Sequence, residues 1–286
     1  MNSPVVSASG LSKRFGTVQA LRDVSFKVEA GQIVGLIGPN GAGKTTALKA
    51  LLGLTSCAGE LTVLGLDPFR SRPRLMQEVS FIADIAVLPR WMKVRQVLEF
   101  AAAVHPRFDP ARAVGFLGRT DIRLDARVQT LSKGMVAQLH LALVMAIDAR
   151  LLVLDEPTLG LDILYRKSFY ESLLNDYFDE KRTIIITTHQ VEEVEHILTD
   201  LMFIQHGRIV LHASMDDVAE RYAEVMVSPA RHAEALALKP IYERKVFGKH
   251  VLLFENADRA RLAKLGEINT PSVADLFVGK MQEATP

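Results

Sequence analysis

The stretch that decides the fold is Gly38-Pro39-Asn40-Gly41-Ala42-Gly43-Lys44-Thr45, which fits the pattern G-x-x-x-x-G-K-S/T. It lies between the apolar run Ile33-Val34-Gly35-Leu36-Ile37 and a segment, 46–54, whose pattern predicts a helix. A buried strand that ends in a glycine-rich turn and opens a helix directs several backbone N–H groups to one point, where the helix also favours negative charge. We therefore expect this turn to bind the phosphates of a nucleoside triphosphate.

The side chains that follow the glycines have separate expected roles. Lys44 is expected to reach the β- and γ-phosphates, and the Thr45 hydroxyl to bind Mg²⁺. Thr46 lies next to them and is expected to pack against or cap the first helical turn at the edge of the nucleotide site. A glycine-rich strand-to-helix turn with an exposed lysine is the structural alternative, but the strand before it and the helix after it favour the phosphate site.

A pair of acidic residues follows a second buried strand. Leu151-Leu152-Val153-Leu154 is wholly apolar, as a parallel strand covered on both faces requires, and it ends in Asp155-Glu156-Pro157. Open α/β sheets bind their ligands at the carboxyl ends of such strands. We expect Asp155 to bind Mg²⁺ and Glu156 to orient or deprotonate the attacking water, because phosphoryl transfer depends on positioning and charge compensation.

From about Val5 to Val218 the chain resembles the nucleotide-binding subunit of an ABC transporter, because weaker motifs follow the two strong ones in the expected order. Leu131-Ser132-Lys133-Gly134-Met135 resembles the signature L-S-G-G-Q, and Leu159-Gly160-Leu161-Asp162 resembles the loop that crosses between the two sites of a dimer. His189 occupies the position of the family's switch histidine after the strand 183–188. Phe15 occupies that of the aromatic residue that stacks on adenine.

The resemblance implies a fold and a mechanism. The implied fold is the α/β P-loop cassette, with a RecA-like parallel sheet, an antiparallel β flap from Val5 to Val28 and a helical subdomain at about 85–149. The implied mechanism is ATP hydrolysis with Mg²⁺ in a homodimer, in which Ser132 and Gly134 of one copy bind the γ-phosphate held by the other. It also implies an integral membrane permease on another chain, of the exporter type, with this chain peripheral on the inner face of the cell membrane.

Two positions depart from the family pattern. Lys133 and Met135 replace a glycine and a glutamine of the signature, although the serine and the last glycine are kept. Where the family has a glutamine that senses Mg²⁺ and the membrane partner, the chain offers Asp84. A carboxylate can bind Mg²⁺ but donates no hydrogen bond when it is ionised. We expect Asp84 to be linked to the metal, with an exposed loop acid as the alternative.

Beyond residue 218 no cassette motif remains, and residues 219–286 are predicted to form a small accessory α+β domain. Its expected features are a hairpin near Gly248-Lys249 and a final helix that begins near Ser272, where Asp275 three residues later completes a capping-box pattern. We expect this helix to bury Val273, Leu276 and Phe277. The expected role of the domain is to stabilise the dimer or to bind a partner.

The composition fits a cytoplasmic enzyme subunit. The 286 residues are 49% hydrophobic, enough for one large domain and a small one, and the formal charge of +1 gives no reason to expect nucleic acid. The single cysteine, Cys57, cannot form an internal disulfide and suits a reducing compartment. We expect neither a signal peptide nor a membrane span, because the most apolar stretch, 139–154, is interrupted by charged residues.

Three functions remain compatible with the sequence. The first is the ATPase that energises a membrane exporter, and it is favoured because Glu156 and His189 would be superfluous in a protein that only binds nucleotide. The second is a soluble ABC-type ATPase not tied to a membrane pore. The third is a nucleotide-gated regulatory module with little turnover, which the departures at Asp84 and in the signature leave open.

Overall fold

The computed structural model describes residues 3–82 and 88–283. Its centre is a sheet with the strand order β5-β6-β7-β3-β8-β9. All neighbours in this sheet are parallel except β8 and β9, which form an antiparallel hairpin. The bounds are β3 Ile33–Ile37, β5 Val79–Ile82, β6 Leu151–Asp155, β7 Thr183–Thr187, β8 Asp200–Gln205 and β9 Arg208–Ser214. The predicted parallel core is confirmed.

The strands β3, β6 and β7 are buried at every position, which explains why the sequence shows them as continuous apolar runs rather than alternating ones. The predicted helix after the phosphate loop is present but lies earlier than expected, because α1 spans Lys44–Leu51 rather than 46–54. Gly53, with φ of 63°, turns the chain out of the helix.

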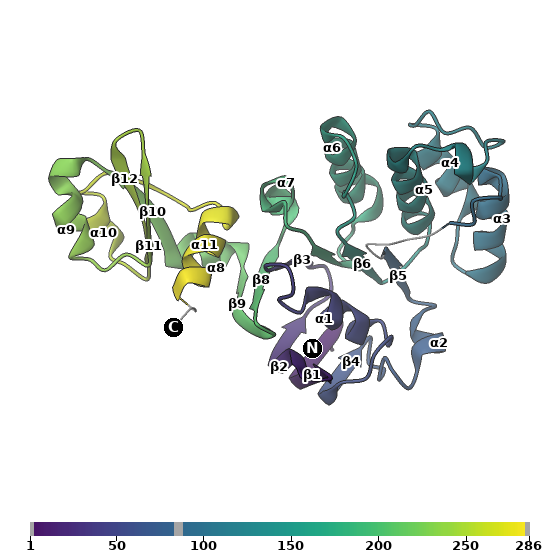
Figure 1. Cartoon of the computed structure of the whole chain (residues 1–286), viewed down its shortest axis with the longest axis horizontal. Coiled ribbons are helices and arrows are strands. Elements are labelled where there is room, and N and C mark those ends of the chain that lie inside the picture. Colours follow the sequence, from purple (N-terminus) through teal and green to yellow (C-terminus); the bar gives the residue numbers. More distant parts are fainter. Residues whose placement is uncertain (1–2, 83–87, 284–286) are drawn as a thin grey trace.

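The antiparallel flap consists of β1 Val6–Phe15, β2 Val18–Val28 and β4 Ala58–Val63, in the order β2-β1-β4. Alternate residues of its strands, among them Val24 and Phe26, pack in one core with Ala47, Leu48 and Leu51 of α1. The flap therefore lies against the helix that follows the phosphate loop (Figure 1). A short helix, α2 Arg72–Leu75, connects it to β5.

The helical region consists of α3 Val94–Val104, α4 Pro110–Leu117 and α5 Lys133–Met145, with a 3₁₀ turn at Val128–Thr130. These helices have a core of their own, which includes Val94, Leu98, Leu117 and Leu139. One strand was not predicted: Val79–Ile82, just before the predicted helical subdomain, forms β5 and pairs with β6. With four residues at the sheet edge, it is too short to give a clear pattern of its own.

The chain leaves the acidic pair through α6 Ile163–Ser172 and a π-helical turn at Leu173–Tyr177 before it enters β7. After β7 follow α7 Val191–Val194 and a 3₁₀ turn at Glu195–Ile197, which lead into the β8–β9 hairpin. The hairpin turns at His206-Gly207.

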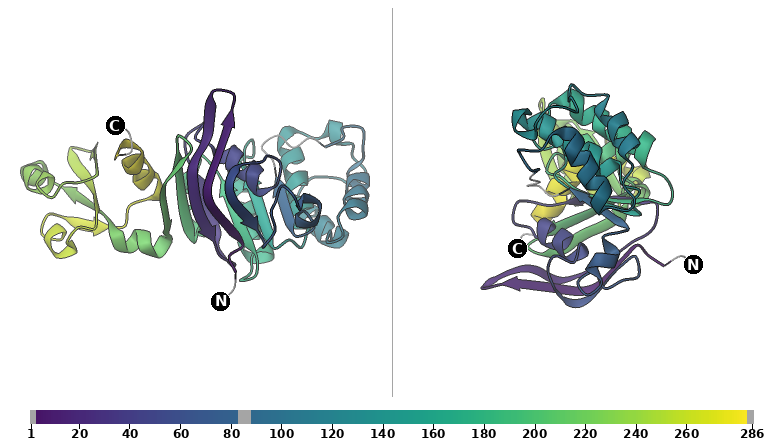
Figure 2. Two further views of the ribbon diagram at one scale, coloured as in Figure 1. Left: turned by 90° about the horizontal axis from the view of Figure 1, so that it is seen from below. Right: turned by 90° about the vertical axis from the view of Figure 1, so that its right-hand side faces the viewer.

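The C-terminal residues form a second sheet with the order β11-β12-β10-β13. Its elements are α8 Met215–Arg221, β10 Tyr222–Val227, a 3₁₀ turn at Pro229–Arg231, α9 His232–Leu236, β11 Tyr242–Val246, β12 Lys249–Glu255, α10 Arg259–Leu262, β13 Glu267–Asn269 and α11 Val273–Glu283. Figures 1 and 2 show this sheet at one end of an elongated molecule and the helical region at the other.

The last helix, α11, returns to the central sheet. Ser272 and Asp275 form the predicted reciprocal cap, since the Ser272 hydroxyl accepts from the Asp275 amide at 3.1 Å and donates to its carboxylate at 2.9 Å. Val273 and Leu276 are buried in the same core as Phe203 of β8. The Phe277 ring meets the Phe203 ring edge to face, 5.3 Å away. The core of the C-terminal end is therefore continuous with that of the central sheet.

Within residues 3–82 and 88–283, we find no helix long and apolar enough to cross a membrane.

Candidate nucleotide-binding and hydrolysis site

The loop 38–43 leaves the buried end of β3 and turns into the first residue of α1. Gly43, with φ of 113°, is the residue before the helix, and a Cβ there would lie 2.6 Å from the carbonyl oxygen of Ala20. A larger residue would push the loop away from the flap. Glycine at this position therefore fixes both the turn of the loop and its close approach to β2.

Lys44 is almost buried, with 8% of its surface exposed. Its ammonium donates to the carbonyl oxygens of Gly38 at 2.6 Å and Pro39 at 3.3 Å. Burial lowers the pKa of Lys44, and the carboxylates of Glu156 and Asp155 oppose that shift. The positive charge is thus held at the loop by backbone oxygens and faces two carboxylates.

Asp155 is the last residue of β6, and its neighbour in the sheet is Thr187, the last residue of β7. The Thr187 hydroxyl donates to Asp155 Oδ1 at 2.5 Å and lies 3.2 Å from the Glu156 backbone nitrogen, from which it accepts. Among residues 3–82 and 88–283, the hydrogen bond to the Asp155 carboxylate is made at Oδ1. Thr187 was not predicted as a site residue, and in the sequence it appears only as the end of an apolar strand.

Glu156 adopts a positive φ of 49°, which is uncommon for a residue with a side chain. Its amide donates to the Thr187 carbonyl at 3.1 Å, and one of its carboxylate oxygens lies 2.8 Å from Nδ1 of His189. His189 comes directly after β7 and Thr188, so both residues extend from the carboxyl ends of adjacent strands. An unusual backbone conformation held by hydrogen bonds to the neighbouring strand is typical of functional sites.

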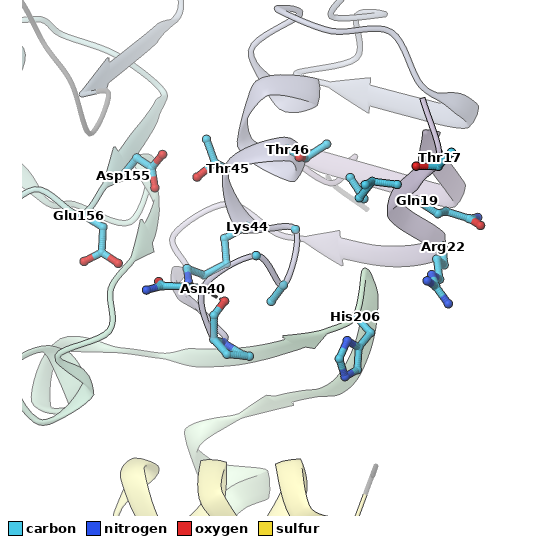
Figure 3. A pocket seen from close by; sticks show the side chains of 16 residues that line it. Thr17, Gln19, Arg22, Asn40, Lys44, Thr45, Thr46, Asp155, Glu156 and His206 are labelled. Carbon is cyan, nitrogen blue, oxygen red and sulfur yellow. Dashed lines mark hydrogen bonds between the residues drawn. The ribbon is translucent and has the colours of Figure 1, made fainter. Parts of the chain in front are cut away.

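A cleft with a volume of 460 Å³ brings the loop and the acidic pair together (Figure 3). In Figure 3, Thr45 lies on the side of Lys44 that faces Asp155 and Glu156. The predicted residues that line this cleft are Pro39, Asn40, Gly41, Ala42, Gly43, Lys44, Thr45, Thr46, Asp155 and Glu156. Gly38 is buried beneath the loop and lines a neighbouring cleft together with His189.

The far wall of the cleft was not predicted. It comes from the start of β2, through Thr17, Gln19 and Arg22, and from His206 in the β8–β9 turn. The turn is bonded to both neighbours, because the Gly207 amide donates to Ala42 at 2.9 Å and its carbonyl accepts from Arg22 at 2.8 Å. Polar residues in hairpin turns are too common to single out from a sequence, so only the fold identifies them.

Some predicted residues lie outside this cleft. Phe15 is exposed at the end of β1, beneath the Lys13 ammonium, and does not line the cleft. Ser132 caps α5 by accepting from the Met135 amide at 3.2 Å, and Asp162 caps α6 by accepting from the Tyr165 amide at 3.0 Å. Gly134 faces the Gly160 carbonyl. The roles of these residues toward nucleotide stay predictions.

Asp84 lies outside the described residues, so its predicted link to the metal stays a prediction. Lys133, the cation that departs from the signature pattern, is exposed at the first position of α5, as a solvated side chain would be.

A second cleft of 770 Å³ borders the acidic pair on the other side. It is lined by Glu156 and His189 and, from the C-terminal helix α11, by Ala274, Phe277 and Val278. The helix α11 therefore forms one wall of the space next to Glu156.

A phosphate loop after β3 of a parallel sheet, with an aspartate and a glutamate at the end of β6 on the far side of β7, defines a P-loop nucleoside triphosphatase. Residues 21–159 match the family described as ABC transporter. The chain is 34% identical over 229 residues to a Nod factor export ATP-binding protein I of Rhizobium sp. (strain N33), covering 78% of this chain and 75% of that protein. The protein belongs to the ABC transporter family of ATP-binding subunits, and it is an ATPase.

Other comparisons agree. The ABC transporter ATP-binding protein YtrB of Bacillus subtilis (strain 168) is 27% identical over 219 residues, covering 76% of this chain and 75% of that protein. A solved structure described as an ATP binding subunit of an ABC transporter superposes with a TM-score of 0.69 at 26% identity. It covers 76% of this chain and 92% of that one. A nucleotide-free ATP-binding cassette, with a TM-score of 0.62 at 18% identity, shares the fold.

Proposed function

We propose that two copies of this chain close on ATP and energise export through a separate transmembrane subunit. The observation that carries the proposal is the meeting of Lys44, Thr45, Asp155 and Glu156 in one cleft, while Ser132 is exposed elsewhere on the same chain. A serine that cannot complete its own site is available to complete that of a second copy. The names of the relatives, which include Nod factor export ATP-binding proteins, support export as the direction.

Within one site, the Lys44 ammonium exchanges a backbone oxygen for phosphate oxygens, and the amides of the loop bind the same group. Thr45 and Asp155 offer a hydroxyl and a carboxylate in the same cleft, the oxygen ligands that Mg²⁺ takes beside phosphates. The ion, when bound, neutralises charge that develops on the phosphoryl oxygens. Glu156 accepts a proton from the attacking water, and His189 holds the Glu156 carboxylate in place.

An exposed apolar surface next to the acidic pair supports the dimer. Ile163 and Leu164 at the start of α6 are 76% and 78% exposed, and Leu159 is exposed just before them. Large apolar side chains grouped on a surface mark interaction sites. Ile163 and Leu164 directly follow Asp162, and Leu159 lines the cleft beside Glu156. We assign this surface, 159–164, to contact with the second copy.

We assign the surface that contacts the membrane permease to the helical region. Trp91, just before α3, is 64% exposed, and tryptophan is enriched at protein interfaces. Its backbone carbonyl accepts from Arg127 at 2.8 Å, which fixes the segment that presents the ring. On this proposal residues 1–218 form the nucleotide-binding domain, 219–286 an accessory domain, and the chain works at the inner face of the cell membrane.

A mixing experiment tests whether one copy completes the site of the other. Lys44→Ala and Ser132→Ala should each be nearly inactive alone. The first loses phosphate binding, and the second can no longer complete the nucleotide site of the other copy. When the two variants are mixed, each mixed dimer contains one intact pair of Lys44 and Ser132, so part of the ATPase activity should return. No return of activity in a mixture that forms dimers would contradict the shared site.

The Glu156→Gln variant tests the assigned proton acceptor. It keeps the size and hydrogen bonds of the side chain but lowers its basicity, so it should bind ATP and accumulate as a closed dimer in gel filtration. Glu171→Gln on α6, outside both clefts, is the matched control and should behave like the wild type. A monomeric, fully active Glu156→Gln protein would exclude the role.

ATPase activity of the wild type that does not respond to a co-reconstituted permease would favour the alternative of a soluble ATPase not tied to a membrane pore.

A further inference from the structure

Three side chains with metal-binding atoms meet in the C-terminal sheet, far from the nucleotide cleft in the sequence. They are His232 at the start of α9, Glu243 in β11 and His250 in β12, and their ligand atoms lie within 4.8 Å of one another. His250 Nδ1 is 2.6 Å and His232 Nε2 is 2.9 Å from the same oxygen, Oε1 of Glu243. Two imidazole nitrogens thus converge on one carboxylate oxygen.

The fold brings these residues together through the register of the hairpin. Glu243 is paired with Leu252, and His250 with Lys245 on one side and Val227 on the other, so Glu243 and His250 share one face of the sheet. The helix α9 covers this face, since its Ala235 packs in one core with Leu252 and Val227. Each of the three residues is therefore held by regular secondary structure.

The hydrogen-bonding capacity of this group is incompletely used. The rings of His232 and His250 are stacked, with centroids 3.7 Å apart and planes inclined by 19°. His232 Nε2 is buried and makes no hydrogen bond of good geometry, although it lies 2.9 Å from the Glu243 oxygen that also contacts His250. A buried nitrogen without a partner is costly, and it leaves a lone pair or a proton directed at no acceptor.

We propose that His232 Nε2, His250 Nδ1 and the Glu243 carboxylate bind a divalent transition metal ion of the zinc class. Two imidazoles and one carboxylate suit zinc and its neighbours, whereas magnesium prefers oxygen ligands alone. The ion would satisfy the unpartnered nitrogen and replace the shared contact to one oxygen by three bonds of about 2.0–2.2 Å. The Glu243 and His232 side chains are partly exposed, which leaves one coordination position open to water.

The charges around the group permit this assignment. Arg231 and Glu234 at α9 pair with each other at 3.3 Å, so neither charge is left over beside the site. The cross-strand neighbour of His250, Lys245, is exposed and directs no ion pair at the group. One carboxylate and two imidazoles therefore face the ion. The site joins α9 to the β11–β12 hairpin and does not depend on the proposed transport function.

Cobalt(II) added to the full-length chain provides the probe, because its visible absorption is intense in a four-coordinate site and weak in an octahedral one. The wild type should show an intense band that saturates at one ion per chain, and zinc should remove it. His232→Phe keeps the stacked ring without its nitrogens and should lose the band, with affinity reduced at least about tenfold. Ions held by Thr45 and Asp155 are common to both proteins and cancel in the comparison.

Two more variants complete the test. Glu243→Gln removes the charged ligand and should also weaken the band, whereas Glu234→Gln, on the same helix, should leave it unchanged. Circular dichroism and thermal unfolding in chelator show whether each variant is folded. Added zinc should raise the Tm of the wild type and of Glu234→Gln, but not that of His232→Phe or Glu243→Gln. An intense band that persists in both His232→Phe and Glu243→Gln, or is absent from the wild type, would overturn the proposal and leave a hydrogen-bonded cluster only.

Discussion

At the scale of single residues, Thr187 determines how the acidic pair of the nucleotide site is presented. Its hydroxyl donates to Asp155 and accepts from the Glu156 amide, so one side chain orients the expected metal ligand and the backbone of the proton acceptor. A residue bonded to both members of the acidic pair is therefore expected to affect hydrolysis by orienting them.

We predict that Thr187→Val lowers the kcat for ATP by roughly 10- to 100-fold, the usual effect of losing a group that orients a metal ligand. The KM for ATP should change much less, because the phosphate loop is untouched. Thr187→Ser keeps the hydroxyl and should recover most of the activity. Steady-state kinetics over a range of Mg²⁺ concentrations provide the measurement, and equal losses in Thr187→Val and Thr187→Ser would count against the role.

The residues predicted from the sequence are those whose chemistry is tied to a fixed spacing. Lys44 and Thr45 follow a glycine pattern, and Asp155 and Glu156 end an apolar run, so each could be assigned to one cleft in advance. Thr187 and His206 reach the site through strand pairing and a hairpin turn, which depend on contacts between distant segments. No local pattern in the chain specifies those contacts.

At the scale of secondary structure elements, the β8–β9 turn joins the flap to the phosphate loop. Gly207 has φ of 76°, and a Cβ on it would lie 2.7 Å from the Ala20 carbonyl oxygen. The turn of the β11–β12 hairpin offers a matched glycine, since Gly248 also has φ of 76° but nothing within 4 Å of an added Cβ. The two glycines therefore share the same φ, but only an added Cβ at Gly207 would collide with a neighbouring strand.

We predict that Gly248→Ala destabilises the protein by about 1 kcal/mol, the cost of a side chain at positive φ. Gly207→Ala should cost more and should also weaken ATP binding, because the turn must move away from the flap and the Ala42 carbonyl. Denaturant unfolding and the binding of a fluorescent ATP analogue measure the two effects. Equal losses of stability at both positions, with ATP binding intact, would show that the contact with the flap is unimportant.

The elements themselves were predicted unevenly. The strands of the central sheet were clear because burial on both faces makes them wholly apolar, and the helix α11 was clear from its cap and its apolar spacing. The strand β5 was hidden because it has only four residues and its neighbours among the described elements along the chain are the helices α2 and α3. The start of α1 was placed two residues late, since the lysine and threonine of the loop already belong to the helix.

At the scale of the whole molecule, a continuous core connects the nucleotide-binding sheet with the C-terminal sheet. Leu276 of α11 is fully buried in the core that also contains Phe203, Val218 and Leu253. Although the two sheets have separate strand orders, this shared packing gives them common side-chain contacts. They should therefore unfold together.

We predict that Leu276→Ala lowers the free energy of unfolding by about 2–5 kcal/mol, the usual range for such a cavity. Val278→Ala, two positions away and 37% exposed, should cost much less. Urea titrations followed by circular dichroism and by Trp91 fluorescence should give coincident transitions in the wild type. A tail that melts separately, with the transition at Trp91 unaffected by Leu276→Ala, would contradict the shared core.

The position of α11 beside His189 has a mechanical consequence. Ala274, Phe277 and Val278 line the same 770 Å³ cleft as Glu156. The helix α11 therefore limits the space beside the carboxylate that we propose as the proton acceptor. A displacement of the C-terminal domain that moves α11 would also change the width of this cleft. On our proposal, binding of the permease or another partner to this C-terminal domain would therefore change the rate of ATP hydrolysis directly.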